Sequence, residues 1–165
     1  MKRIGFGQVE PNHLSAQRNG QIYAQRKYVG NREYLENGMF LKYTIVDGKE
    51  AVSVDGDGEW MLVLNEVKLY DDAWRESYKD FAMKPDNSKE MYPRLFKTAV
   101  GDIFTTNTIG DGTADVAVKV GDKLTVGANG YLNVATPADG EMAWLVVKVY
   151  TMPDNQPAVK IQRIA

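Results

Sequence analysis

The chain has 165 residues, a mass of 18.5 kDa and 44% hydrophobic residues, which is enough for one globular core and argues against wholesale disorder. Its 20 basic and 22 acidic residues are well mixed and give a net charge of −2, so no basic patch for nucleic acid is indicated. The absence of cysteine excludes disulfides, thiolate metal ligands and cysteine nucleophiles.

The first 37 residues are rich in Gln, Asn, Gly and Arg and show no sustained period of 2 or 3.6 residues. We interpret residues 1–37 as an extended N-terminal arm outside the core, with a disordered terminus as the alternative reading. Scattered aromatic side chains on a polar tether are suited to docking into grooves of a neighbouring molecule. From this arm we expect four partner contacts: Arg3, Phe6, Tyr23 and Tyr28.

Residues 38–165 are expected to form a single β-rich domain. Alternation of side chains over 39–46 predicts a strand that ends at Asp47-Gly48, a strong hairpin signal, with 51–54 as the return strand. A second turn at 55–58 leads into a strand predicted over Trp60 to Tyr70.

Residues 71–97 read as an insertion with a short helix. Aromatic residues recur there at helical spacing, while Pro85 and Pro93 exclude a long helix. Covering the β core is one role for these aromatics, and a contact patch is the other, since aromatics dominate interface anchors. The candidates for partner binding in this insertion are Trp74, Tyr78, Phe81 and Tyr92.

After Val100 the strand pattern resumes, with turn signals at short intervals, as in a sandwich or barrel. The strands predicted are 102–109, 114–120, 123–126, 131–135, 141–152 and 158–164. Val100-Gly101-Asp102 and Val120-Gly121-Asp122 repeat one another, and we interpret both as corners that deliver a strand. The fold class predicted is mainly β: a sandwich or barrel of short antiparallel strands with one helical insertion and the arm.

No catalytic, metal or cofactor site is expected. His13 is the single histidine, so histidine triads and zinc sites cannot be assembled from this chain alone. The acidic loop 55–59 lacks the downstream Glu and the helices of an EF-hand, and a hairpin turn explains it better. We expect no enzyme activity. The apolar run 142–147 is too short to span a bilayer, and no apolar leader is visible, so no membrane segment is expected.

Residues 117–132, AVKVGDKLTVGANGYL, resemble the small β-domains of tailed-phage capsid decoration and head-fibre (auxiliary head) proteins, in which a strand passes a Gly-Asp corner into a hairpin. Residues 99–107, AVGDIFTTN, are similar to the segment that opens this unit. The resemblance covers about residues 98–136 and leaves the insertion at 71–97 without a counterpart.

This resemblance implies an accessory protein on the outer capsid surface of the virion, made in the host cytoplasm. Its partner would be the major capsid protein, and it would form a homo-oligomer, a trimer or another symmetric cluster. An arm that crosses between capsomers would add avidity. The alternative is a carbohydrate- or receptor-binding module of a phage fibre or tail, suggested by the clustered aromatics. A bacterial β-barrel domain with another partner is a third reading.

Overall fold

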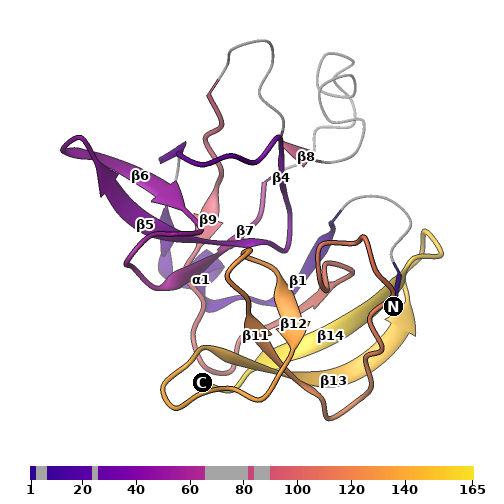
Figure 1. Ribbon diagram of the computed structural model, residues 1–165. Helices are drawn as coiled ribbons and strands as arrows, with labels where there is room; N and C mark the ends of the chain where they lie inside the picture. Colours follow the sequence, from indigo (N-terminus) through magenta and orange to yellow (C-terminus); the bar gives the residue numbers. More distant parts are fainter. Residues whose placement is uncertain (3–6, 24–25, 66–81, 84–89) are drawn as a thin grey trace.

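The computed structural model describes residues 1–2, 7–23, 26–65, 82–83 and 90–165, and the prediction of a mainly β fold is confirmed (Figure 1). The first sheet has the strand order β1-β10-β14-β13-β11-β12. Its strands are β1 (Val9–His13), β10 (Ile103–Thr106), β11 (Lys123–Val126), β12 (Leu132–Val134), β13 (Ala143–Thr151) and β14 (Pro157–Arg163). All of its pairings are antiparallel.

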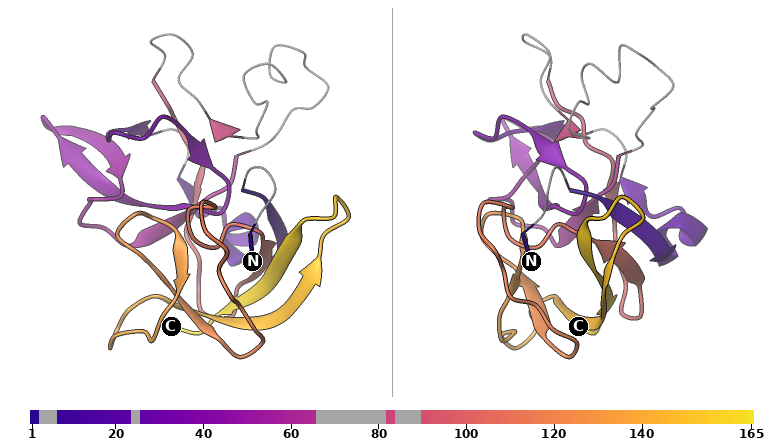
Figure 2. Two further views of the ribbon diagram at one scale, coloured as in Figure 1. Left: turned by 45° about the vertical axis from the view of Figure 1, so that its right-hand side comes forward. Right: turned by 90° about the vertical axis from the view of Figure 1, so that its right-hand side faces the viewer.

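The second sheet has the order β2-β9-β7-β5-β6-β3, and a two-stranded ladder pairs β4 with β8. The elements are β2 (Ile22–Tyr23), β3 (Lys27–Tyr28), β5 (Phe40–Val46), β6 (Lys49–Ser53), β7 (Trp60–Val63), β9 (Leu95–Phe96), β4 (Leu35–Glu36) and β8 (Ala82–Met83). Only β3 and β6 pair in parallel among these described strands. In Figure 2 the second sheet lies above the first.

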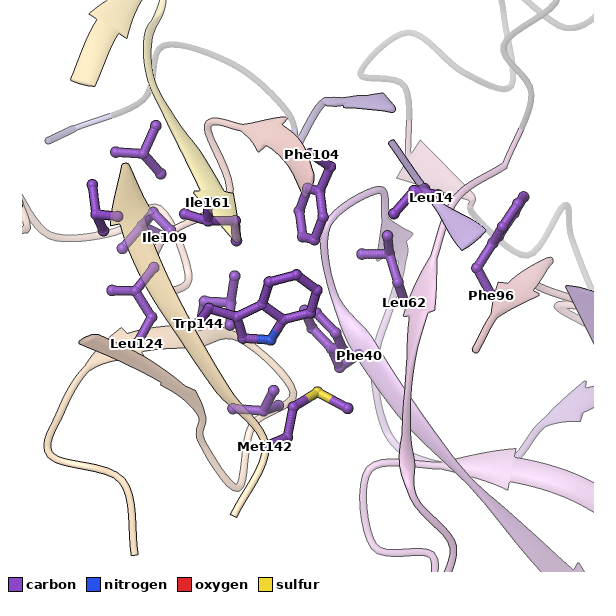
Figure 3. Packing of buried hydrophobic residues seen from close by; sticks show 14 of the residues in the cluster. Leu14, Phe40, Leu62, Phe96, Phe104, Ile109, Leu124, Met142, Trp144 and Ile161 are labelled. Carbon is purple, nitrogen blue, oxygen red and sulfur yellow. The ribbon is translucent and has the colours of Figure 1, made fainter. Parts of the chain in front are cut away.

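The main hydrophobic cluster lies between the two sheets and is centred on Trp144 of β13 (Figure 3). Its ring packs edge-on against Phe104 of β10 at 4.9 Å between centroids, and against Phe40 of β5 at 5.9 Å. A second cluster covers the opposite face of the second sheet, where Leu41 and Val52 meet Tyr131 from the turn that precedes β12. Both faces of the second sheet are therefore buried near its centre.

The hairpin of β5 and β6 forms as its sequence predicts. Asp47 and Gly48 both take positive φ, 51° and 73°, as a tight two-residue hairpin turn requires. The register pairs Val46 with Lys49 and Tyr43 with Val52. The end of this hairpin projects from the body of the molecule (Figure 1).

The two Val-Gly-Asp segments are corners of the first sheet with the same hydrogen-bond pattern. The carboxylate of Asp102 accepts from the Ala99 amide at 3.0 Å, and that of Asp122 accepts from the Lys119 amide at 2.9 Å. Both glycines have positive φ, 97° at Gly101 and 92° at Gly121. These segments are structural turns, as predicted. The valines of both corners are exposed, Val100 by 67% and Val120 by 63%.

The expectation that residues 1–37 lie outside the core is wrong for the described parts, 7–23 and 26–37. Strand β1 pairs with β10, and Leu14 and Ala16 lie in the main cluster. Helix α1 (Ser15–Asn19), which the sequence pattern did not predict, follows β1. The polar composition misled because polar atoms hold the segment: the Gly7 amide, for example, donates to buried Glu36 at 2.7 Å.

Three further expectations need revision or fall outside the described residues. Residues 114–120 form no strand: alternate side chains such as Val116 are half-buried, but the backbone of Val116 bonds only with Met1, in both directions, and no described strand pairs with the segment. Strand β7 ends at Val63, and the rest of the predicted strand beyond residue 65 is not described. Of the predicted insertion, 82–83 and 95–96 are strands, and its helical part lies outside the described residues.

Replacing Gly130 tests the joint between the sheets. Its carbonyl accepts from Phe40 N at 2.7 Å, its φ is 76°, and a Cβ there would lie 2.5 Å from Phe40 O. We expect Gly130→Ala to lower the free energy of unfolding by about 2–4 kcal/mol, measured by urea denaturation. Gly140→Ala is the matched control, because Gly140 has φ 74° but open space around it, and it should cost only about 1 kcal/mol. Equal losses in the two variants would contradict the proposed close contact.

The aspartates of the two corners differ in their hydrogen-bond partners, and mutation should reveal this difference. Asp102 is 2% exposed and also accepts from Ser15 N and Ser15 Oγ, both at 2.9 Å, at the start of α1. Asp102→Ala should therefore destabilise the protein by about 2–3 kcal/mol, and Asp122→Ala by about 1 kcal/mol, in thermal or urea unfolding. A larger effect at Asp122 would show that Asp102 does not anchor the N-terminal segment.

Candidate functional site

Two segments far apart in the sequence lie side by side at the outer edge of the second sheet. The amide of Tyr28 in β3 donates to Met91 O at 2.8 Å, and both side chains are buried in the second cluster. This pairing leaves Lys27, Glu90 and Tyr92 on the outside. The exposed side chains are thus held by a backbone that is anchored in the core.

Tyr92, Glu90 and Lys27 form one hydrogen-bonded group on this edge. The Tyr92 hydroxyl donates to one oxygen of the Glu90 carboxylate, and the Lys27 ammonium binds the other. These bonds, that of Lys27 first, lower the pKa of Glu90, while the bond with Glu90 raises the pKa values of Lys27 and Tyr92. Tyr92 keeps 44% of its surface exposed.

A second charged pair continues the edge toward the projecting hairpin. Arg26 Nε lies 2.5 Å from Glu50 Oε2 on β6, and Tyr43 lies beside them with its pKa raised by partial burial and then by a hydrogen bond with Glu50. A groove of about 380 Å³ opens here, lined by Arg26, Tyr43, Glu50, Gly58, Glu59, Met61 and Lys97. Lys97 and Glu59 form another ion pair across it, 3.0 Å apart.

Two apolar side chains next to the hairpin turn are exposed. Ile45, which pairs with Glu50, is 64% exposed, and Val46 is 41% exposed. We call the whole strip from the hairpin end to Tyr92 the edge surface; it comprises Arg26, Lys27, Ile45, Glu50, Glu90 and Tyr92. Two exposed side chains, Ile45 and Tyr92, and two ion pairs, Arg26–Glu50 and Lys27–Glu90, all belong to this edge.

The structure places the predicted contact residues in different settings. Tyr92 lies on the edge surface. Tyr28 is next to it in the fold but is only 6% exposed, and burial raises its pKa, so its ring is a core side chain and is not presented to a partner. The backbone of Tyr23 pairs with Leu95 in β2 and β9. The remaining candidates lie outside the described residues: Arg3, Phe6, Trp74, Tyr78 and Phe81.

Sequence reasoning missed Ile45 and the charged pairs that flank it. The signal was available for Ile45, because an Ile-Val pair directly before an Asp-Gly turn places apolar side chains at the end of a hairpin. No comparable signal marks Arg26 and Glu50, which are brought together by the parallel pairing of β3 with β6.

Within the described ranges, no group of three or more His, Cys, Asp or Glu side chains is placed to hold a metal ion. His13 Nε2 lies 3.1 Å from Arg18 Nη2 on the surface. No helix in the described part of the chain is long and apolar enough to cross a membrane.

Comparison with protein-family models, with curated proteins and with solved structures gives no match to this chain.

Removing the Glu90 carboxylate tests the organisation of the edge surface. In Glu90→Gln, we expect the pKa of Tyr92 to fall toward its ordinary value of 10.0, because the hydrogen bond and the negative charge that hold its proton are weakened. The pKa is read from the ring signals of Tyr92 in an NMR titration. Glu59→Gln, which removes a carboxylate bound to Lys97 instead, should leave the Tyr92 pKa unchanged. No change in Glu90→Gln would mean that the two groups do not interact in solution.

Proposed function

We propose that this protein is a structural virion component that decorates and stabilises the outer surface of a tailed-phage capsid by binding the lattice of major capsid protein. The observation that carries the proposal is the edge surface, which presents exposed Ile45 and Tyr92 together with the ion pairs Arg26–Glu50 and Lys27–Glu90. Binding to another protein is the chemistry that such a surface supports best. The resemblance of residues 98–136 to decoration proteins supports the choice of partner.

The edge surface has the composition of a protein contact. Aromatic and apolar side chains supply most of the binding energy at interfaces, while charged neighbours set register and exclude wrong partners. Tyr92 is suited to the role of anchor because its hydroxyl is already bonded to Glu90 and its neighbour Met91 is buried. Little conformational freedom is lost when such a side chain binds.

The segment that resembles decoration proteins and the proposed contact surface lie in different sheets. Residues 98–136, which carry the resemblance, supply β10, β11 and β12 of the first sheet. The edge surface belongs to the second sheet, at the edge formed by β3 and the β5–β6 hairpin. In our proposal the first sheet forms the structural frame, and several copies, as a trimer or another symmetric cluster, attach together and gain avidity.

Tyr92 also favours a second candidate, a carbohydrate- or receptor-binding module of a phage fibre or tail. An exposed aromatic ring next to a carboxylate, here Glu90, offers a stacking face together with hydrogen-bond acceptors for sugar hydroxyls. Glycan-array binding that is lost in Tyr92→Ala would favour this candidate over capsid decoration.

Cosedimentation with emptied, expanded capsids of the cognate phage tests the main proposal. Ile45→Asp and Tyr92→Ala should each weaken binding by about tenfold or more, since each removes an exposed anchor of the contact. The matched controls lie outside the edge surface: Val120→Asp, at a site 63% exposed against 64% for Ile45, and Tyr34→Ala, at a site 37% exposed.

The two controls should bind as the unchanged protein does. If the unchanged protein does not bind expanded capsids, capsid decoration is wrong. If it binds and the four variants all bind equally, the function stands but the edge surface is not the contact.

A further inference from the structure

Asparagine followed by glycine occurs three times: Asn19-Gly20, Asn37-Gly38 and Asn129-Gly130. Asparagine is thermally labile, and a following glycine leaves its side chain open to attack by the next backbone nitrogen. That nitrogen bonds to the side-chain carbonyl carbon, the carbon–nitrogen bond of the amide breaks, and the backbone proton leaves with ammonia. Water then opens the cyclic imide to aspartate or isoaspartate, so the net change is amide plus water to carboxylate plus ammonium.

Asn37 is protected by its surroundings. The side-chain oxygen accepts from Asn65 N at 2.7 Å, the side-chain nitrogen donates to Asn65 O at 3.0 Å, and the side chain is buried. The attacking nitrogen is also engaged, because Gly38 N–H donates to Val63 O at 3.0 Å. Closing the imide ring here would break all three bonds inside the protein.

Asn129 is exposed but lies in a turn that is fixed on both sides. Its side-chain oxygen accepts from Tyr131 N at 3.2 Å, and Arg32 binds its backbone carbonyl. Gly130 is buried, its N–H donates to Gly127 O at 2.8 Å, and its carbonyl accepts from Phe40. The nitrogen of Gly130 can reach the side chain of Asn129 only if the turn breaks these hydrogen bonds and moves.

Asn19 has much weaker protection. It is the last residue of a five-residue helix, and both Asn19 and Gly20 are exposed. Gly20 has open space around it, and its N–H bonds only at the helix end, to Ala16 O. A helix of this length opens readily at its end, which frees the nitrogen and lets the backbone turn toward the side chain.

We propose that Asn19 is a site of spontaneous imide-mediated deamidation in the folded protein, while Asn37 and Asn129 are spared. The site lies where the chain passes from β1 and α1 at the first sheet to β2 at the second. Isoaspartate adds one atom to the main chain there. The hydrogen bond from Lys97 N to Gln21 O, 3.2 Å, and the pairing of β2 with β9 are then loosened. This inference is independent of capsid attachment.

The test is peptide mapping by mass spectrometry after incubation of the full chain at mildly alkaline pH in water enriched in heavy oxygen. We expect heavy oxygen to enter position 19, as aspartate and isoaspartate, at least about tenfold faster than position 37 or position 129. In urea, where the fold no longer protects any site, the three rates should become similar, because all three sites have glycine directly after the asparagine.

Asn19→Gln should remove the fast product and leave the other two sites as they were. The proposal is overturned if Asn19 reacts no faster than Asn37 in the folded chain, or if Asn129 reacts first. It is also overturned if all three sites react at the same rate and this rate does not change between water and urea.

Discussion

The contact between Trp144 and the two phenylalanines beside it joins the two sheets. Phe104 comes from the first sheet and Phe40 from the second, and both rings contact an indole that is fully buried. The indole nitrogen has no hydrogen-bond partner among the described residues. Leaving a buried donor unpaired is unfavourable, so the apolar packing of the ring must outweigh that penalty. The relative position of the sheets, and with it the place of the projecting hairpin, depends on this contact.

Polar bonds next to this apolar contact fix the register of the chain. Just before Phe40, the side-chain amide of Asn37 bonds both the N–H and the carbonyl of Asn65, as a paired strand would. Thr108 Oγ1 donates to the backbone carbonyl of Asn37 at 2.8 Å. The residue before Asn37 is the buried Glu36, whose carboxylate accepts from the Tyr131 hydroxyl at 2.7 Å. Apolar packing alone tolerates sliding, whereas buried polar groups must find particular partners. These bonds therefore select one arrangement of the two sheets.

The parts of the fold that the sequence predicted are those in which local signals agree. Side-chain alternation and the Asp47-Gly48 turn defined β5 and β6, and the corners at Gly101 and Gly121 followed from their repeat. The N-terminal segment was misread because its stability comes from distant polar partners such as Asp102, which binds Ser15. The strand predicted over residues 114–120 was wrong for a related reason. Side-chain alternation indicates that one side is buried, but it does not indicate that a neighbouring strand is present.

The candidate site shows the same division. Tyr92 was predicted as a contact residue because aromatic side chains in a polar segment indicate contact, and the structure shows that its side chain is exposed. Tyr28 has the same residue type in a similar polar context, yet it is buried, because the parallel pairing of β3 with β6 turns it toward Val52. Pairing between residues far apart in the chain decides which tyrosine faces outward, and a single sequence carries no record of that pairing.

Natural edge strands usually carry charge, which prevents uncontrolled pairing with other chains. On the edge surface the charges are present but are largely paired with each other, as in Arg26–Glu50 and Lys27–Glu90. Paired charges keep the strip hydrated without a strong field of either sign, so it does not attract a charged partner at a distance. In the attachment that we propose, specificity must then come from short-range fit at Ile45 and Tyr92. A contact with two such anchors is modest for one copy, so the binding that we propose requires many copies on a regular lattice.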